Sequence, residues 1–121
     1  MVDMLRVGST VLGASDVRRA AEFWGRALGY VPRDEVLDET FVVLAPADGT
    51  GQNISLMLSE TPVQERPRVH LDLYADDPEA EIERLLELGA SRVDWQGYPP
   101  DRDYTVLADT EGNRFCVIDK G

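Results

Sequence analysis

The residue best suited to chemistry in this sequence is its single histidine, His70. It lies in the stretch RVHLDLY, where apolar and polar residues alternate as they do in a half-buried β-strand. Because strand residues two apart share a face, the face of His70 should also carry Asp72 and Tyr74. An imidazole in such company can serve as a metal ligand, as a general acid or base, or as a purely structural group. We favour a pocket-lining role, with acid/base catalysis as the second interpretation.

The single cysteine, Cys116, lies in the stretch RFCVID and should share its strand face with Arg114 and Ile118. A lone cysteine cannot form an internal disulfide. An imidazole can activate a thiol, so a nucleophilic pair of Cys116 and His70 is conceivable. Cysteines are also often buried as small hydrophobic residues, and this interpretation is favoured.

Two aromatic residues, Trp95 and Tyr104, flank a loop that contains glycine and proline. Their faces could close over a pocket and stack on a planar ligand or lie against a cationic one. Packing within the loop explains them equally well. Trp24, in contrast, falls on the apolar face of an expected helix and is predicted to belong to the core.

Two helices should position these residues. The first is expected to begin after Asp16, a good N-cap, and to end at Gly29, while the second follows Asp77 and ends at Gly89. Apolar residues at helical spacing form one face of each. On the first helix this face consists of Val17, Ala20, Ala21, Trp24 and Leu28, and on the second of Ile82, Leu85 and Leu86.

The chain repeats itself. Asp16 and Asp77 are 61 residues apart, and so are Gly51 and Gly112 in the two turn-like stretches GTGQN and TEGNR. Each half therefore reads β-α-β-β-β, in modules of about 1–60 and 66–121 joined by the linker SETPVQERP. A module with one helix cannot cover both faces of its sheet, so the two modules should form a single domain of 1–121.

Composition narrows the partners. The 121 residues carry a net charge of −11, which repels nucleic acid and acidic membrane surfaces and attracts cations. The apolar runs are too short to cross a bilayer, and the N-terminus lacks the pattern of a signal peptide. We expect a cytoplasmic protein without a membrane segment.

Three stretches show a resemblance to a known family: VLGASDVRRAAEFWGRALGY, HLDLYADDPEAEIERLLELGA and LADTEGNRFCVID. They resemble the vicinal oxygen chelate superfamily, the group of glyoxalases, fosfomycin- and bleomycin-resistance proteins and extradiol dioxygenases. The resemblance covers the whole chain and implies an α+β fold. Two tandem βαβββ modules would form a curved, cup-shaped mixed sheet with the helices outside, and the protein would be a homodimer.

The resemblance also implies where a metal ion would be bound. Metal-using members take ligands from the first and last strand of each module, and those positions correspond here to Ser9, Ser55, His70 and Cys116. Serine hydroxyls are weak ligands for Zn²⁺, Ni²⁺ or Fe²⁺, so at most a two-ligand remnant would survive. We expect neither a metal nor another cofactor, and the metal-dependent activities of the family are disfavoured.

The sequence therefore favours a metal-independent protein of the glyoxalase and bleomycin-resistance type that holds an aromatic or cationic small molecule in its cup. The alternative is a lyase or isomerase that uses His70 as acid/base or as a partial metal ligand. The pocket is expected to mix apolar walls with a few polar groups. Its predicted lining is Ser9, Ser55, Met57, His70, Asp72, Tyr74, Trp95, Tyr104, Arg114 and Cys116.

Overall fold

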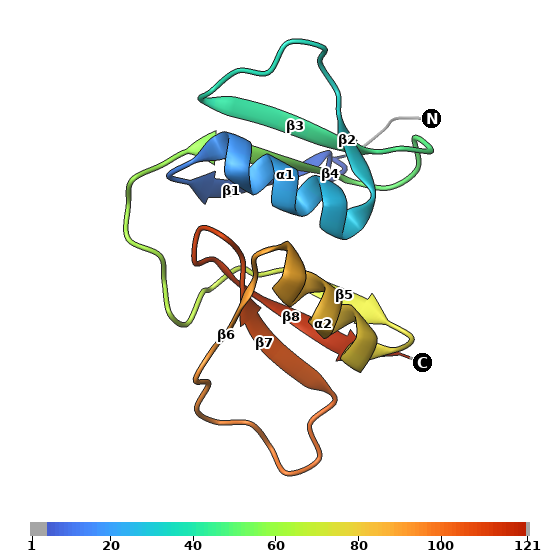
Figure 1. Ribbon diagram of the computed structural model, residues 1–121, viewed down its shortest axis with the longest axis vertical. Helices are drawn as coiled ribbons and strands as arrows, with labels where there is room; N and C mark the ends of the chain where they lie inside the picture. Colours follow the sequence, from blue (N-terminus) through green and yellow to red (C-terminus); the bar gives the residue numbers. More distant parts are fainter. Residues whose placement is uncertain (1–4, 121) are drawn as a thin grey trace. The chain divides into compact units, whose positions relative to one another are not determined.

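The computed structural model describes residues 5–120 and contains two compact units that meet in sequence between Glu60 and Thr61. Each unit has one α-helix and one four-stranded sheet (Figure 1). Both follow the predicted order β-α-β-β-β. The α+β fold class and its two tandem modules are therefore confirmed.

The sheet of the first unit has the strand order β1-β4-β3-β2. Its first and last strands pair in parallel, and the remaining pairs are antiparallel. In chain order the elements are β1 (Ser9–Ala14), α1 (Val17–Leu28), β2 (Tyr30–Pro32), β3 (Phe41–Pro46) and β4 (Asn53–Leu58).

The second unit repeats this arrangement with the strand order β5-β8-β7-β6. Again the first and last strands pair in parallel. The elements are β5 (Asp72–Ala75), α2 (Pro78–Leu88), β6 (Ser91–Arg92), β7 (Tyr104–Ala108) and β8 (Arg114–Asp119).

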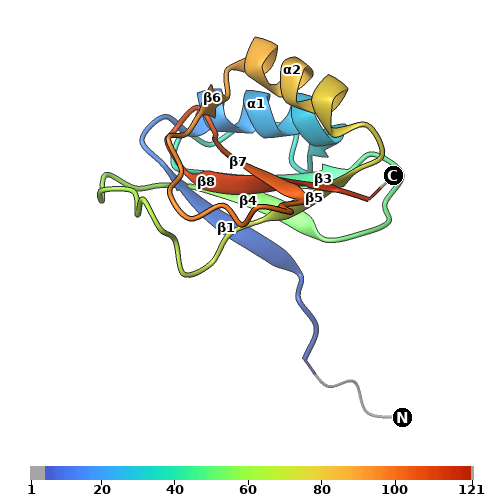
Figure 2. The same cartoon turned by 90° about the horizontal axis from the view of Figure 1, so that it is seen from below.

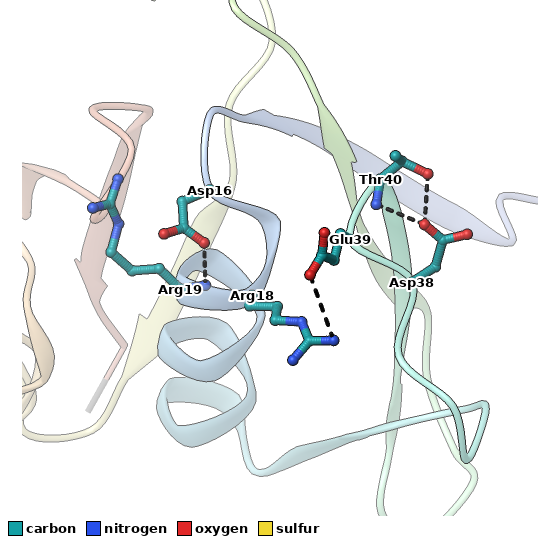
Figure 3. Close-up of polar contacts among 6 residues, drawn as sticks. All are labelled: Asp16, Arg18, Arg19, Asp38, Glu39 and Thr40. Carbon is teal, nitrogen blue, oxygen red and sulfur yellow. Dashed lines mark hydrogen bonds and ion pairs between the residues drawn. The ribbon is translucent and has the colours of Figure 1, made fainter.

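Helix α1 begins and ends as the sequence predicts. The Asp16 carboxylate accepts a hydrogen bond from the backbone N–H of Arg19 at 3.1 Å, which caps the first turn (Figure 3). At the other end Gly29 adopts the left-handed conformation with φ 71°, which glycine tolerates without a Cβ clash.

The apolar face of α1 forms the core of the first unit. The helix lies along one face of its sheet (Figure 2). Trp24 is 1% exposed, and its ring meets that of Phe23 edge to face with centroids 5.0 Å apart. Trp24 is thus a core residue, as predicted, and Phe23 joins it.

Helix α2 is capped by the same chemistry but buries less of its surface. Asp77 accepts a hydrogen bond from the N–H of Ala80 at 3.2 Å, and Pro78 occupies the first turn, where its missing N–H costs nothing. Only Ile82 and Leu85 are buried along the helix. The core of the second unit therefore depends mainly on its sheet, through Val106, Leu107, Phe115 and Val117.

The loop between β2 and β3 is ordered by its own polar groups. Asp38 accepts hydrogen bonds from the hydroxyl and the N–H of Thr40, at 2.6 and 2.7 Å (Figure 3). The hydrogen bond from the Thr40 hydroxyl is the main reason why the pKa of the Asp38 carboxyl is lowered, and the bond from the Thr40 N–H lowers it further. Beside it Arg18 and Glu39 lie 4.0 Å apart, both largely exposed, so this pair adds little stability.

One strand is shorter than the sequence suggests. The alternation in RVHLDLY predicts a strand that includes His70, yet β5 begins at Asp72. Asp72 pairs with Cys116, so the same register would place His70 opposite Arg114, the first residue of β8, but the strand pairing does not extend that far. One further bond, from the N–H of Cys116 to the carbonyl of Leu71, ends the ladder. His70 therefore lies just before the strand.

Candidate functional site

A pocket of about 430 Å³ lies in the second unit. Its walls are largely apolar, with polar groups that converge from the end of the linker, from β5 and from β8. This composition is usual for sites that bind small molecules. The lining consists of Arg66, Pro67, His70, Asp72, Trp95, Tyr104, Val106, Arg114, Phe115, Cys116 and Ile118.

Cys116 lies at the centre of this lining because β8 is the middle strand between β5 and β7. In the register of the sheet, Asp72 is its partner on one side and Val106 its partner on the other. Residues paired across a sheet project to the same face. The fold therefore places the Asp72 carboxylate beside the Cys116 thiol.

The second polar contact joins His70 to Asp72. The imidazole Nε2 lies 3.0 Å from a carboxylate oxygen of Asp72, and the two side chains are 41% and 47% exposed. His70, Asp72 and Cys116 each offer one metal-ligating atom, and these atoms all lie within 4.8 Å of one another. Strand alternation predicts that His70 and Asp72 share a face. The structure brings both side chains into one cluster with Cys116.

Burial raises the pKa of the Cys116 thiol to about 11, and the nearby negative charge of Asp72 and a hydrogen bond to it act in the same direction. Since the thiolate is the reactive form of cysteine, the side chain is protonated and unreactive at neutral pH. The sequence left open a nucleophilic pair of His70 and Cys116. In this arrangement His70 contacts Asp72, and the thiol is not activated.

We expect Cys116 to be alkylated slowly at pH 7 and to gain reactivity only as the pH approaches 11. The pH dependence of labelling by iodoacetamide, followed by mass spectrometry of the metal-free protein, measures this directly. Asp72→Asn should shift the midpoint of the labelling curve to lower pH, because it removes the negative charge. Rapid labelling at pH 7 would contradict the burial of the thiol.

The aromatic part of the pocket is held by one arginine and by two tyrosines that pack together. The Arg66 guanidinium lies 4.8 Å from the centroid of the Trp95 ring and donates a hydrogen bond to the carbonyl of Gln96 at 3.0 Å. Tyr104 packs against Tyr98 with centroids 5.4 Å apart. The hydroxyl oxygen of Tyr98 accepts a hydrogen bond from the N–H of Val106 at 2.8 Å. The loop from 95 to 104 is therefore tied to the pocket wall.

Arg114 forms a wall shared with a second, more polar pocket of about 660 Å³. Its Nη1 donates a hydrogen bond to the carbonyl of Gly112 at 2.9 Å. Its Nε is buried and has no hydrogen-bond partner in the described part of the chain. The Arg114 guanidinium therefore brings a positive charge to the pocket wall. This charge is opposite in sign to that of Asp72.

Three predicted site residues belong to the first unit, whereas the pocket is lined by the second. Ser9 and Ser55 hydrogen-bond to each other through their hydroxyl oxygens, 2.6 Å apart, and Ser55 is 1% exposed. Neutral hydroxyls that hydrogen-bond to each other are poor ligands for a divalent ion. Met57, on the same strand as Ser55, is 47% exposed.

One predicted residue of the second unit lies apart from the pocket lining. Tyr74 is 70% exposed, and its ring lies 5.1 Å from the Lys120 ammonium. The other six, His70, Asp72, Trp95, Tyr104, Arg114 and Cys116, all line the pocket. Strand alternation gives the face of a residue but not the extent of a pocket along that face.

Sequence reasoning missed Arg66 and Pro67, which it assigned to the linker. No local pattern marks them, because their place in the wall depends on where the chain passes before β5. Val106 and Phe115, also in the lining, are ordinary core residues by pattern. Their contribution follows from strand register.

Comparisons with known proteins agree with this architecture. Residues 9–118 match the family model described as glyoxalase-like domain. No curated protein matches the sequence. No helix within the described range 5–120 is long and apolar enough to span a bilayer.

Solved structures share the fold at low sequence identity. A glyoxalase-related enzyme from Fulvimarina pelagi has a TM-score of 0.68 and 18% identity, with 97% of this chain and 89% of that one covered. A member of the glyoxalase/bleomycin resistance protein/dioxygenase superfamily from Sphaerobacter thermophilus has a TM-score of 0.67 and 22% identity, with 97% of this chain and 98% of that one covered. The bleomycin-binding protein of Streptomyces verticillus, solved with copper(II)-bleomycin, has a TM-score of 0.59 and 19% identity, with both chains fully covered.

Proposed function

Because this chain belongs to the glyoxalase-like domain family, we propose that it binds a small planar molecule through the pocket of its second unit. The observation that carries the proposal is the 430 Å³ pocket, whose lining includes Trp95, Tyr104 and Asp72. The fold is also that of a bleomycin-binding protein. Fold alone serves several functions, so the pocket itself must supply the specificity.

The net charge of the whole chain favours a ligand with an amino or cationic group, for which Asp72 would be the partner in a lining that also holds Arg66 and Arg114. Asp72 is the acidic residue of the lining, and its carboxylate is about half exposed. The net charge of −11 raises the local concentration of cations around the whole chain. Arg66 already covers the Trp95 ring, so the aromatic wall favours a planar group stacked beside the guanidinium.

We further propose that this binding does not depend on an ion at the four positions implied by the resemblance. The hydrogen bond between the Ser9 and Ser55 hydroxyls supports this, because neutral hydroxyls are weak ligands and these two already contact each other. A homodimer and a cytoplasmic location also remain predictions. Sedimentation of the purified protein measures the first of these.

The test is a binding titration in the presence of chelator with bleomycin and with matched planar aromatic amines and carboxylates. Tryptophan fluorescence and melting temperature report binding, since a ligand of the native state raises the melting temperature. We expect the amines to bind more tightly than the carboxylates. Trp95→Ala should weaken binding about 3- to 10-fold, the loss of one aromatic contact.

Tyr74→Ala serves as the matched control, because Tyr74 lies in the same unit but outside the pocket lining. It should leave the affinity unchanged. Failure of all three ligand groups to shift either signal would remove the support for small-molecule binding. A preference for carboxylates would instead place the ligand against Arg66 and Arg114.

A second candidate function is acid/base catalysis by His70. The specific observation is the 3.0 Å contact between its Nε2 and Asp72, because a carboxylate can hold an imidazole in one orientation. Turnover of any bound compound should then disappear in His70→Ala while the compound still binds. Unchanged turnover in this variant would exclude the mechanism.

A further inference from the structure

We propose that His70, Asp72 and Cys116 form a binding site for one borderline divalent metal ion, best suited to Zn²⁺. The site lies wholly within the second unit. It goes beyond the proposed function, which requires no ion. It shares His70 and Cys116 with the four positions that the family resemblance implies, but Asp72 takes the place of Ser9 and Ser55.

The geometry already brings the three donor atoms together. They lie within 4.8 Å of one another, and the His70 to Asp72 distance is 3.0 Å. Around a tetrahedral Zn²⁺, bond lengths of about 2.0–2.3 Å place neighbouring ligand atoms roughly 3.3–3.6 Å apart. Shifts of about 1 Å therefore suffice to complete the coordination.

The scaffold permits these shifts and limits them. Asp72 and Cys116 are register partners on adjacent parallel strands, so the backbone fixes their separation. His70 precedes β5 and its side chain is 41% exposed, so its ring has room to turn. Two donors held by a sheet and one adjustable donor make a partly formed site.

The donor set selects the type of ion. A thiolate and an imidazole suit Zn²⁺ and Co²⁺, whereas Ca²⁺ and Mg²⁺ prefer sites built from oxygen ligands. On binding, the thiol proton passes to solvent and the sulfur becomes an anionic ligand. Three protein ligands leave a fourth position open. All three residues line the 430 Å³ pocket, so this position faces the space proposed for a small molecule.

The nearest alternative is an ion held by the four matched positions. That arrangement would need Ser9 and Ser55, whose hydroxyls are 2.6 Å apart and bonded to each other. It would not need Asp72. Variants at these positions therefore separate the two arrangements.

The experiment is a titration of the metal-free full chain with Co²⁺, followed by competition with Zn²⁺. We expect one equivalent to bind and to give a thiolate-to-cobalt charge-transfer band in the near ultraviolet, with visible bands typical of tetrahedral coordination. Asp72→Asn and His70→Ala should each weaken binding at least about tenfold, since even outer-shell changes have effects of that size. Cys116→Ser should abolish the charge-transfer band.

Matched variants serve as controls. Asp101→Asn removes the same charge from an exposed position of the second unit and should bind like the wild type. Ser9→Ala and Ser55→Ala should also leave the titration unchanged. Because His70 and Asp72 are exposed, their variants keep the proposal testable even if Cys116→Ser fails to fold.

Three results would overturn the proposal: no charge-transfer band in the wild type, a band that survives Asp72→Asn at full affinity, or loss of binding in Ser9→Ala. The last result would place the ion at the four matched positions. The titration uses metal alone, whereas small-molecule binding is measured with chelator present. Failure of one proposal therefore leaves the other standing.

Discussion

Trp24→Ala should lower the free energy of unfolding by about 3–5 kcal/mol, the usual range for deleting a large aromatic side chain from a core. Trp24 is 1% exposed and packs edge to face on Phe23. Urea denaturation followed by far-ultraviolet circular dichroism gives the change, independently of the lost fluorescence.

The second tryptophan of the chain is the matched control. Trp95 lies in the pocket lining, with Arg66 over its ring, and is only partly buried. We expect Trp95→Ala to change the free energy of unfolding by less than about 1 kcal/mol, as is usual outside the core. Equal losses in the two variants would show that the loop from 95 to 104 belongs to the core.

Asp109→Ala should destabilise the protein by about 2–4 kcal/mol. Asp109 is 3% exposed, and one carboxylate oxygen accepts hydrogen bonds from the N–H groups of Glu111 and Asn113, both at 2.9 Å. Removing a buried acceptor costs about 1–3 kcal/mol for each donor that loses its bond. Denaturant unfolding of the variant measures the loss, and Asp109→Asn, which keeps one acceptor oxygen, should lose less.

The repeat supplies the control for this prediction. Asp48 lies 61 residues before Asp109, in the matching turn of the first unit, and it also accepts hydrogen bonds from the N–H and hydroxyl of a following residue, Thr50. Asp48 is exposed, so water replaces the lost bonds. Asp48→Ala should therefore be much milder, and equal effects would contradict the argument from burial.

Much of the fold could be predicted from the sequence because its signals are local. Asp16, Asp77, Gly29 and Gly89 mark the helix ends through chemistry that acts within a few residues, and the structure places all four as expected. The 61-residue spacing then identified the two modules. The contribution of Phe23 to the core, beside the predicted face of α1, depended on packing.

The site was only partly predictable. Alternation placed His70 with Asp72 and Cys116 with Arg114, but it could not show that Asp72 pairs with Cys116. A shift of two residues between strands keeps every side chain on its face, so the pattern leaves such registers open. Arg66 enters the pocket from the linker, where no periodicity exists.

The parallel pairs within the two units have a consequence for how the chain folds. Ser9 pairs with Asn53 and Asp72 pairs with Cys116, so each closure joins residues 44 positions apart. Closing a loop of this length costs chain entropy before the contacts repay it, whereas helices and hairpins form from near neighbours. We expect this closure to be the slow step in each unit. The cluster at Asp72 and Cys116 would then be among the last features to assemble, and a half-folded chain would have its helices but no site.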